Sequence, residues 1–198
     1  KLQKNWPNRE CLFDIEGILS PGALLPNMNN HRFSDLRPGA RNQYFYVRGL
    51  FEQAYFFSGG EKIKFTCKGQ LSTQFLIPSE QFGLGGLYSV RGYQERVINA
   101  DNAVFLSLEG FCRPLHLLKK SKDMLYFLAF VDYGLGGGQL FLPDQQVATS
   151  SLLGVGPGLH YNIGNWLKAR VYWGVQVIAS PRTSQHGQRF NFNVMVSF

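Results

Sequence analysis

Residues 62–75 read KIKFTCKGQLSTQF, and two kinds of side chain alternate along this stretch. The odd positions carry mainly apolar side chains, and the even positions carry lysines and neutral polar residues. Successive side chains of a β-strand point to opposite faces, so this pattern predicts a strand with one apolar and one polar face. The segment is about 14 residues long, which exceeds the usual globular strand and suffices to cross a bilayer at the usual tilt.

Seven further segments show the same period of two and are predicted to be strands: 9–18, 43–57, 102–114, 124–133, 152–163, 166–178 and 189–198. The connections between them differ in length: those at 19–42, 76–101 and 134–151 are long and 179–188 is intermediate, whereas those at 58–61, 115–123 and 164–165 are shorter. Outer-membrane barrels show this asymmetry, because their periplasmic turns are short and their external loops are long. The sequence therefore predicts an all-β, antiparallel transmembrane β-barrel, with eight strands in this chain and Phe198 at the periplasmic end.

The composition fits such a barrel. Aromatic residues make up 15% of the 198 residues and glycines number 22, while charged residues make up 17%, below the usual figure of about 25%. The mean hydropathy is −0.14, and no apolar run approaches the ~20 residues that a membrane-spanning helix needs. A helical membrane protein is therefore excluded, whereas strands that alternate between lipid-facing and lumen-facing side chains average to a neutral hydropathy.

The chain is basic, with a formal net charge of +7 and a pI near 9.4. This balance fits a basic channel or a surface that meets anionic lipid or polypeptide, and it equally fits scattered charges that confer solubility. Seven basic residues fall on the polar faces of the predicted strands and would line a channel: Arg48, Lys62, Lys64, Lys68, Arg113, Lys168 and Arg170. No dense basic run with interleaved aromatic residues marks a nucleic-acid site, so no nucleic-acid partner is expected.

Patterns that indicate catalysis or metal binding are missing from the sequence. Cys11, Cys67 and Cys112 lie far apart without a CxxC pair, which argues against a disulfide framework and against zinc. The four histidines lack metal-ligand spacing, and there is neither a phosphate-binding glycine loop nor a G-x-S-x-G nucleophile elbow. We therefore expect no enzymatic activity, no cofactor and no metal. The chain also opens without a signal peptide, from which we expect a fragment that lacks its natural N-terminus.

The connection 76–101 contains the stretch PSEQFGLGGLYSVRGY at residues 78–93. Its four glycines allow positive φ and close approach to other chain. The stretch presents a single arginine, Arg91, and an arginine in a folded loop needs an acidic partner or must stay in water. We predict that the loop folds into the channel with Arg91 as its anchor; from the residues alone, a solvated Arg91 at a loop tip is the alternative.

The stretch also carries a resemblance to a known family. The elements that carry it are PSEQF at 78–82, Gly85-Gly86, SVRGY at 89–93, Asp101-Asn102 and SLE at 107–109. They resemble the sixth extracellular loop and the next strand of the two-partner secretion transporters of the ShlB/FhaC/HecB type. The VRGY/F element is shared with the wider superfamily that includes the BamA-type assembly factors. The resemblance implies a 16-stranded barrel, of which residues 1–198 would be the C-terminal half with an inward-folded loop 76–101; the N-terminal strands, the POTRA domains and a plug helix would be absent.

The resemblance also implies a set of site residues. In such transporters the loop arginine is held by acidic residues on the lumen face of nearby strands, and the loop anchor motif here is Val90, Arg91, Gly92 and Tyr93. The segment FVDYG at 130–134 resembles the family's Phe-x-Asp-x-Gly motif. The implied lumen partners are Glu109, Phe130 and Asp132, which the alternation independently places on inward faces. The terminal Phe198 resembles the signal by which assembly machinery recognises outer-membrane barrels.

The function that follows from the resemblance is transport. The protein would lie in the bacterial outer membrane, in contact with its lipid, and would secrete an unfolded partner polypeptide through the barrel without a cofactor. Two alternatives remain open at this stage. One is a BamA-type assembly factor that inserts other membrane proteins, and the other is a surface antigen barrel that transports nothing.

Overall fold

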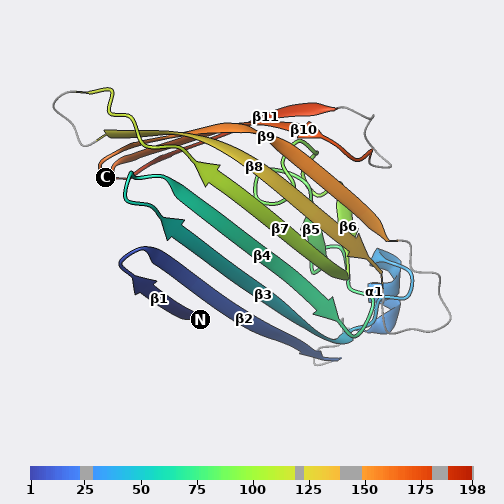
Figure 1. Ribbon diagram of the computed structural model, residues 1–198. Coiled ribbons are helices and arrows are strands. Elements are labelled where there is room, and N and C mark those ends of the chain that lie inside the picture. The colour runs from blue at the N-terminus through green and yellow to red at the C-terminus, as the bar shows by residue number, and fades with distance from the viewer. Residues whose placement is uncertain (23–28, 119–122, 139–148, 180–186, 198) are drawn as a thin grey trace.

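The computed structural model describes residues 1–22, 29–118, 123–138, 149–179 and 187–197. Within these ranges nine strands form one antiparallel sheet in chain order (Figure 1): β1 (Leu2–Trp6), β2 (Arg9–Pro21), β3 (Gln43–Phe56), β4 (Lys62–Ser72), β7 (Asn102–Phe111), β8 (Asp123–Gly137), β9 (Ser150–Ile163), β10 (Leu167–Gln176) and β11 (Gln188–Val196). Between β4 and β7 the chain makes an excursion that contains β5 (Phe82–Leu84) and β6 (Ile98–Ala100), which form a separate two-stranded sheet. A short helix, α1 (Asn30–Leu36), lies between β2 and β3.

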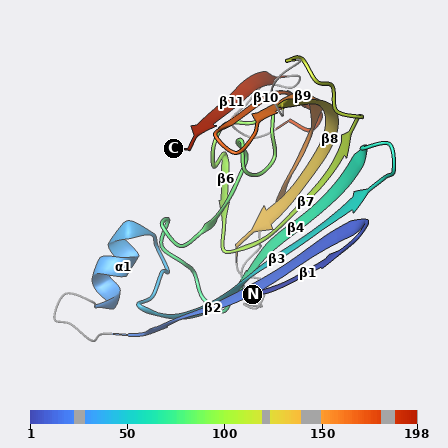
Figure 2. The same cartoon turned by 90° about the vertical axis from the view of Figure 1, so that its left-hand side faces the viewer.

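The main sheet is strongly curved, and the excursion between β4 and β7 lies on its concave side (Figure 2). β1 and β11 stand at the two ends of the strand order and do not pair with each other. The described part is therefore an open arc and not a closed barrel. The predicted all-β, antiparallel architecture is confirmed.

The predicted count of eight strands is too low for the described part of the chain. Besides β5 and β6 in the excursion, the additional strand is β1 in the main sheet, whose sequence LQKNW has no regular alternation. Its extended form comes from the hairpin with β2, in which Leu2 pairs with Phe13 and Trp6 pairs with Arg9. Pairing with β2 stabilises the extended conformation of β1, so the residues of β1 show no alternation from which a strand could be predicted.

Several element boundaries also differ from the prediction: β2 continues to Pro21 instead of ending at 18, and β7 ends at Phe111 instead of 114. β4 ends at Ser72 instead of continuing to 75, and there the side chain of Asn102 accepts the Ser72 backbone N–H at 2.9 Å. β8 continues to Gly137 instead of ending at 133. The connection 19–42, expected to be loop throughout, contains α1, whose N-cap Asn29 accepts a hydrogen bond from the Arg32 backbone N–H. No helix in the described ranges is long and apolar enough to span a membrane.

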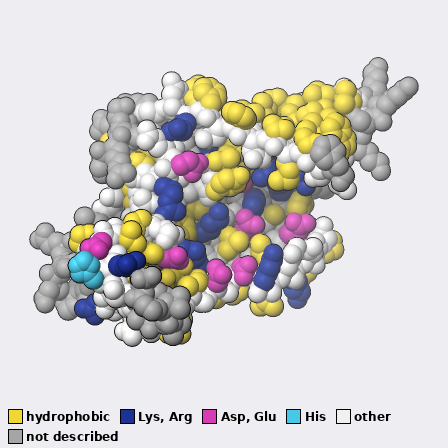
Figure 3. Space-filling model, turned by 180° about the vertical axis from the view of Figure 1, so that it is seen from behind, with side chains coloured by type: hydrophobic (Ala, Val, Ile, Leu, Met, Phe, Trp, Pro, Cys, Tyr) yellow, Lys and Arg dark blue, Asp and Glu magenta, His cyan; other side chains and the backbone are white. Residues whose placement is uncertain are grey.

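The two faces of the sheet differ in chemistry. Large apolar side chains on the convex face stay exposed, among them Phe13, Ile15, Ile63, Leu71, Phe127, Val131, Val171, Trp173, Phe190 and Phe192. The concave face carries charged and polar side chains, and Figure 3, which views the molecule from behind, shows both signs of charge across the middle of the sheet. A soluble sheet buries its apolar face, so this inverted arrangement is the one expected of strands that face lipid.

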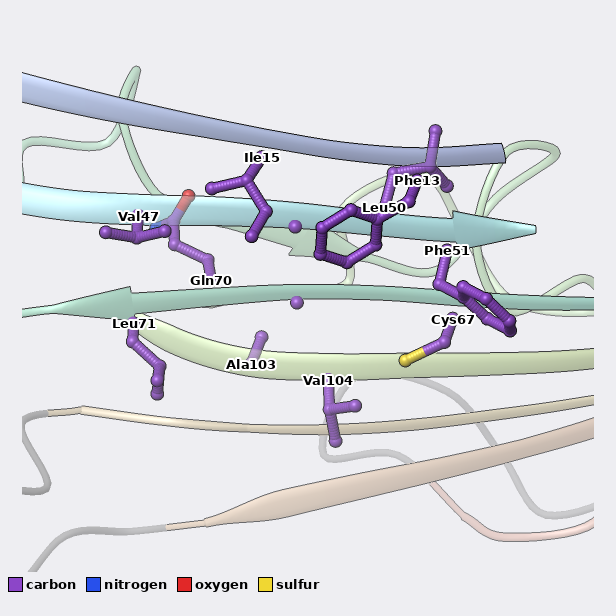
Figure 4. Close-up of a pocket in the computed structure, with 12 residues that line it drawn as sticks. Phe13, Ile15, Val47, Leu50, Phe51, Cys67, Gln70, Leu71, Ala103 and Val104 are labelled. Atoms are coloured by element: carbon purple, nitrogen blue, oxygen red, sulfur yellow. The ribbon is translucent and has the colours of Figure 1, made fainter. Parts of the chain in front are cut away.

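A shallow apolar groove of about 420 Å³ runs across the convex face of β2, β3, β4 and β7 (Figure 4). It exists because two glycines, Gly49 and Gly69, are cross-strand partners and leave no side chains between their neighbours. A Cβ atom built at Gly49 would meet nothing within 4 Å. Since this groove lies on the face opposite the excursion, it takes no part in the candidate site below.

Candidate functional site

The loop between β4 and β7 follows a path that only glycine permits at several points. Gly85 and Gly92 have φ values of 101° and 97°, in the left-handed region that side chains rarely adopt. A Cβ atom at Gly85 would lie 2.3 Å from the backbone oxygen of Gln94 within the same loop. The chain therefore folds back tightly on itself before it presents the VRGY segment to the sheet.

Arg91 is held by two carboxylates from the concave face. Its Nε and Nη2 atoms donate to the two oxygens of Asp132 at 2.6 and 2.7 Å, and its Nη1 atom donates to Glu109 at 2.6 Å. The Arg91 backbone N–H also donates to Asp132, at 3.1 Å. Ser107 donates to Asp132 at 2.7 Å and accepts from Arg91 Nη2 at 3.2 Å. This planar, two-pronged pairing fixes both the position and the orientation of the guanidinium.

Two aromatic rings complete the Arg91 site. The guanidinium carbon lies 3.7 Å from the ring centroid of Phe130 and 4.7 Å from that of Tyr172, distances at which a cation is attracted to a ring face. Arg91 is only 4% exposed, and Asp132 is fully buried. Burial acts to lower the pKa of Arg91, but the adjacent Asp132 and Glu109 outweigh it and raise that pKa. The guanidinium therefore stays charged, and its attraction to the carboxylates is little screened by water.

The residues on either side of Arg91 pack against the sheet as closely as the arginine does. Val90 and Tyr93 are fully buried. The Tyr93 hydroxyl donates to the Ile178 carbonyl at 2.5 Å and accepts from the Leu153 N–H at 3.2 Å. The side chain of Gln176 donates to the Gly92 carbonyl at 2.8 Å. The VRGY segment is thus bonded to β7, β8, β9 and the end of β10.

Glycines in the sheet make room for this contact. A Cβ atom at Gly154 would lie 2.0 Å from the Arg91 carbonyl oxygen, and one at Gly174 would lie 2.3 Å from the Gly92 nitrogen. On β8, Cβ atoms at Gly134 and Gly136 would lie 2.8 Å from Val90 and Ala100, respectively. We call these four residues the glycine wall. Loop atoms occupy the space that side chains would fill, so the loop and the wall fit each other only while all four positions lack a Cβ atom.

The first part of the loop is attached to the neighbouring strands β3 and β4 of the concave face. Tyr46 on β3 donates to the Glu80 carboxylate at 2.5 Å. Arg48 and Gln70 both donate to the Glu80 backbone carbonyl, at 2.9 and 3.2 Å. The loop is therefore bonded to four consecutive strands, with Glu80 held by β3 and β4 and Arg91 held by β7 and β8.

The comparison with protein families identifies the chain. The profile of the family described as haemolysin secretion/activation protein ShlB/FhaC/HecB matches residues 25–161. The chain belongs to this family. Members of this family are outer-membrane β-barrel transporters of two-partner secretion, so the chain is assigned to the outer membrane of a Gram-negative bacterium.

A solved structure shares the fold of this family member. CdiB from Escherichia coli matches with a TM-score of 0.71 and 17% sequence identity, over 99% of this chain and 35% of the CdiB chain. The chain thus spans about a third of the length of the structure it matches. No curated protein matches the chain significantly.

The structure of this ShlB/FhaC/HecB-family chain brings together most of the residues predicted from its sequence. Val90 to Tyr93 meet Glu109, Phe130 and Asp132 on the concave face, whereas Phe198 lies outside the described residues. The sequence analysis missed Tyr172, Glu80 and the glycine wall. The one available signal was the alternation of inward-facing and outward-facing positions along each strand. All five of these strand residues fall on inward positions: Gly134, Gly136, Gly154, Gly174 and Tyr172.

The seven predicted channel-lining basic residues have four different surroundings. Arg48 and Lys68 bond the loop, since Lys68 donates to the Tyr88 carbonyl at 3.1 Å, and Lys64 forms an ion pair with Glu52 at 2.8 Å. Lys62 lies 4.0 Å from the Phe111 ring centroid. Lys168 and Arg170 are exposed on β10, and Arg113 is exposed beyond the end of β7. In the described ranges, no cluster of three His, Cys, Asp or Glu residues suits a metal ion, and the three cysteines are free.

Proposed function

We propose that the chain forms the C-terminal part of an outer-membrane barrel that secretes an unfolded partner polypeptide, and that loop 76–101 closes the channel until transport begins. The observation that carries this proposal is the buried Arg91–Asp132–Glu109 cluster, which holds a loop across the concave face of an arc whose convex face is apolar. A surface antigen that transports nothing has no need of such a loop.

The remainder of the barrel would pair with the two free edges. β1 and β11 have no neighbour on one side in the described part, and unpaired backbone groups are too costly to face lipid. Strands from the rest of the protein, together with the POTRA domains, would close the barrel and bring the partner polypeptide to it. The concave face would then be the channel wall.

Transport requires the loop to move. Between Glu80 and Arg91 the loop lies on the concave face of β3 to β8, and it fills the space along the glycine wall. An extended polypeptide in the channel would need that space. Release breaks charge-assisted hydrogen bonds and leaves Arg91 to be hydrated, and no covalent step is involved. The polar and charged residues of the concave face would then offer an unfolded chain hydrogen-bonding groups without one strong binding site.

The experiment is to replace Arg91 with Ala in the intact transporter. We expect normal insertion in the outer membrane, judged by heat-modifiable migration, together with faster proteolysis of the loop and a higher ion conductance in planar bilayers, because the loop no longer closes the channel. Arg32→Ala is the matched control, because Arg32 is an exposed arginine on α1. Conductance and proteolysis that both stay at the level of the control would show that Arg91 does not anchor the loop.

A BamA-type assembly factor is the alternative that shares the VRGY/F element. The match to the ShlB/FhaC/HecB profile favours secretion. The two are separated by assaying export of the partner encoded with the transporter alongside outer-membrane protein levels in a deletion strain. Loss of the partner from the medium at unchanged outer-membrane protein levels is the result expected here.

A further inference from the structure

A second buried ion pair involves the same loop and lies apart from Arg91. Arg37 donates to both carboxylate oxygens of Asp101, from Nη1 at 2.5 Å and from Nη2 at 2.9 Å. The Asp101 side chain is fully buried, and that of Arg37 is 25% exposed. The two residues are 64 positions apart in the chain, so this pair joins separate loops.

Asp101 connects the two ends of loop 76–101. Its carboxylate accepts the Leu76 backbone N–H at 3.0 Å, where the loop begins, and a side-chain bond from Gln81 at 3.3 Å. Its own backbone N–H donates to Gly137 on β8 at 3.1 Å, and its carbonyl accepts from Gln70 on β4 at 3.1 Å. The buried Asp101 carboxylate therefore connects the start of the loop to its end. The Asp101 backbone forms hydrogen bonds with β4 and β8, the two strands that flank β7.

Arg37 brings a third segment to this point. It is the C-cap residue of α1, where its backbone N–H donates to the Phe33 carbonyl. Besides Asp101, it donates to the Leu76 carbonyl at 2.8 Å and lies 5.2 Å from the ring centroid of Phe75. Figure 1 shows α1 at the end of the sheet where β2 ends and β3 begins. The connection between β2 and β3 is thereby fastened to the base of the loop.

We infer that Arg37 and Asp101 are further positioning residues for transport, forming a base latch that has to open together with the Arg91 site before the loop can leave the concave face. This inference rests on the proposed function of the loop. The Arg91 site holds the tip of the loop on β7 and β8, whereas the base latch holds its two ends to α1.

The buried charge explains why Arg37 matters more than its partial exposure suggests. Without Arg37, the fully buried Asp101 carboxylate would keep only neutral donors, Leu76 N–H and Gln81. An uncompensated buried charge is strongly unfavourable, so the folded-in loop is destabilised relative to a released loop in which Asp101 is hydrated. Replacing Asp101 as well removes that charge and should recover part of the loss.

The test uses the intact transporter in planar bilayers. Arg37→Ala is expected to raise the fraction of time in the high-conductance state about tenfold, the factor that corresponds to the loss of one hydrogen bond to a charged group, and Arg32→Ala on the same helix is expected to leave it unchanged. Arg37→Ala with Asp101→Asn should lie between Arg37→Ala and the parent. The free-energy effects of two independent sites add, so their effects on the open fraction multiply. Arg37→Ala with Arg91→Ala should therefore give the product of the two single effects.

Insertion is checked by heat-modifiable migration, since a merely structural role would reduce insertion without changing single-channel behaviour. If Arg37→Ala does not insert, Arg37→Lys replaces it, with a smaller increase expected because the charge is kept but the two-pronged pairing is lost. Arg37 variants that behave like Arg32→Ala, while Arg91→Ala opens the channel, would overturn the base latch and leave the proposed function standing. If Arg91→Ala and the Arg37 variants all conduct like the parent, the proposed loop function fails as well.

Discussion

We expect Asp132 to contribute far more than Glu109 to holding the loop, and Asp132→Asn and Glu109→Gln measure the difference. Asp132 is fully buried and accepts three hydrogen bonds from Arg91, whereas Glu109 is 13% exposed and accepts one. Removing one partner of a buried ion pair costs about 3 kcal/mol at the lower end, which is about a 150-fold change in the equilibrium for loop release. A single bond to a charged group corresponds to about 1.5 kcal/mol, or about tenfold.

The assay is amide hydrogen exchange of residues 84–93 in the purified transporter, measured by mass spectrometry. The Arg91 N–H donates to Asp132 itself, so its exchange reports the opening directly. Amides of β3 should exchange equally slowly in both variants and the parent, which shows that the sheet is retained. Equal effects of the two substitutions, or faster exchange in Glu109→Gln than in Asp132→Asn, would refute the reasoning from burial and bond number.

Three further predictions follow from contacts on the two faces of the sheet. Gly174→Ala should increase loop proteolysis because its Cβ would meet Gly92 N at 2.3 Å, whereas Gly49→Ala, with nothing within 4 Å, should leave it unchanged. Tyr93→Phe removes the hydroxyl that bonds Leu153 and Ile178, and exchange of residues 84–93 should rise about fivefold, as for a net loss of about 1 kcal/mol. Val171→Arg, on the exposed apolar face, should reduce the fraction folded in lipid vesicles, as expected for a cost of about 2–4 kcal/mol, while Lys168→Gln should not.

The alternation of side chains was enough to predict eight of the nine strands of the main sheet and the inward faces of β7 and β8 at the Arg91 site. Glu109 and Phe130 are direct cross-strand partners in the structure, as are Ser107 and Asp132. Parity states which face a residue takes but not which residues lie opposite each other, since the register depends on pairing between strands. That Arg91 meets Glu109 and Asp132 was therefore an expectation that needed the family resemblance.

The contacts that the sequence did not reveal join segments far apart in the chain. Glu80 meets Tyr46 across 34 positions, and Arg37 meets Asp101 across 64. Neither belongs to a local pattern, because each depends on how the loops fold back over the sheet. β1 and α1 were missed for a related reason, since a hairpin partner and a single cap stabilise elements whose own residues have no marked periodicity.

The glycine wall has a consequence for the width of the passage once the loop has left. Gly134, Gly136, Gly154 and Gly174 present bare backbone toward the interior, so this side of the pore would be deeper by the depth of a side chain than the side lined by lysines. The bulkiest side chains of a translocating polypeptide would fit there, along β8 to β10. If the loop leaves the concave face as proposed, the glycines that seat it would also set where the open channel is widest.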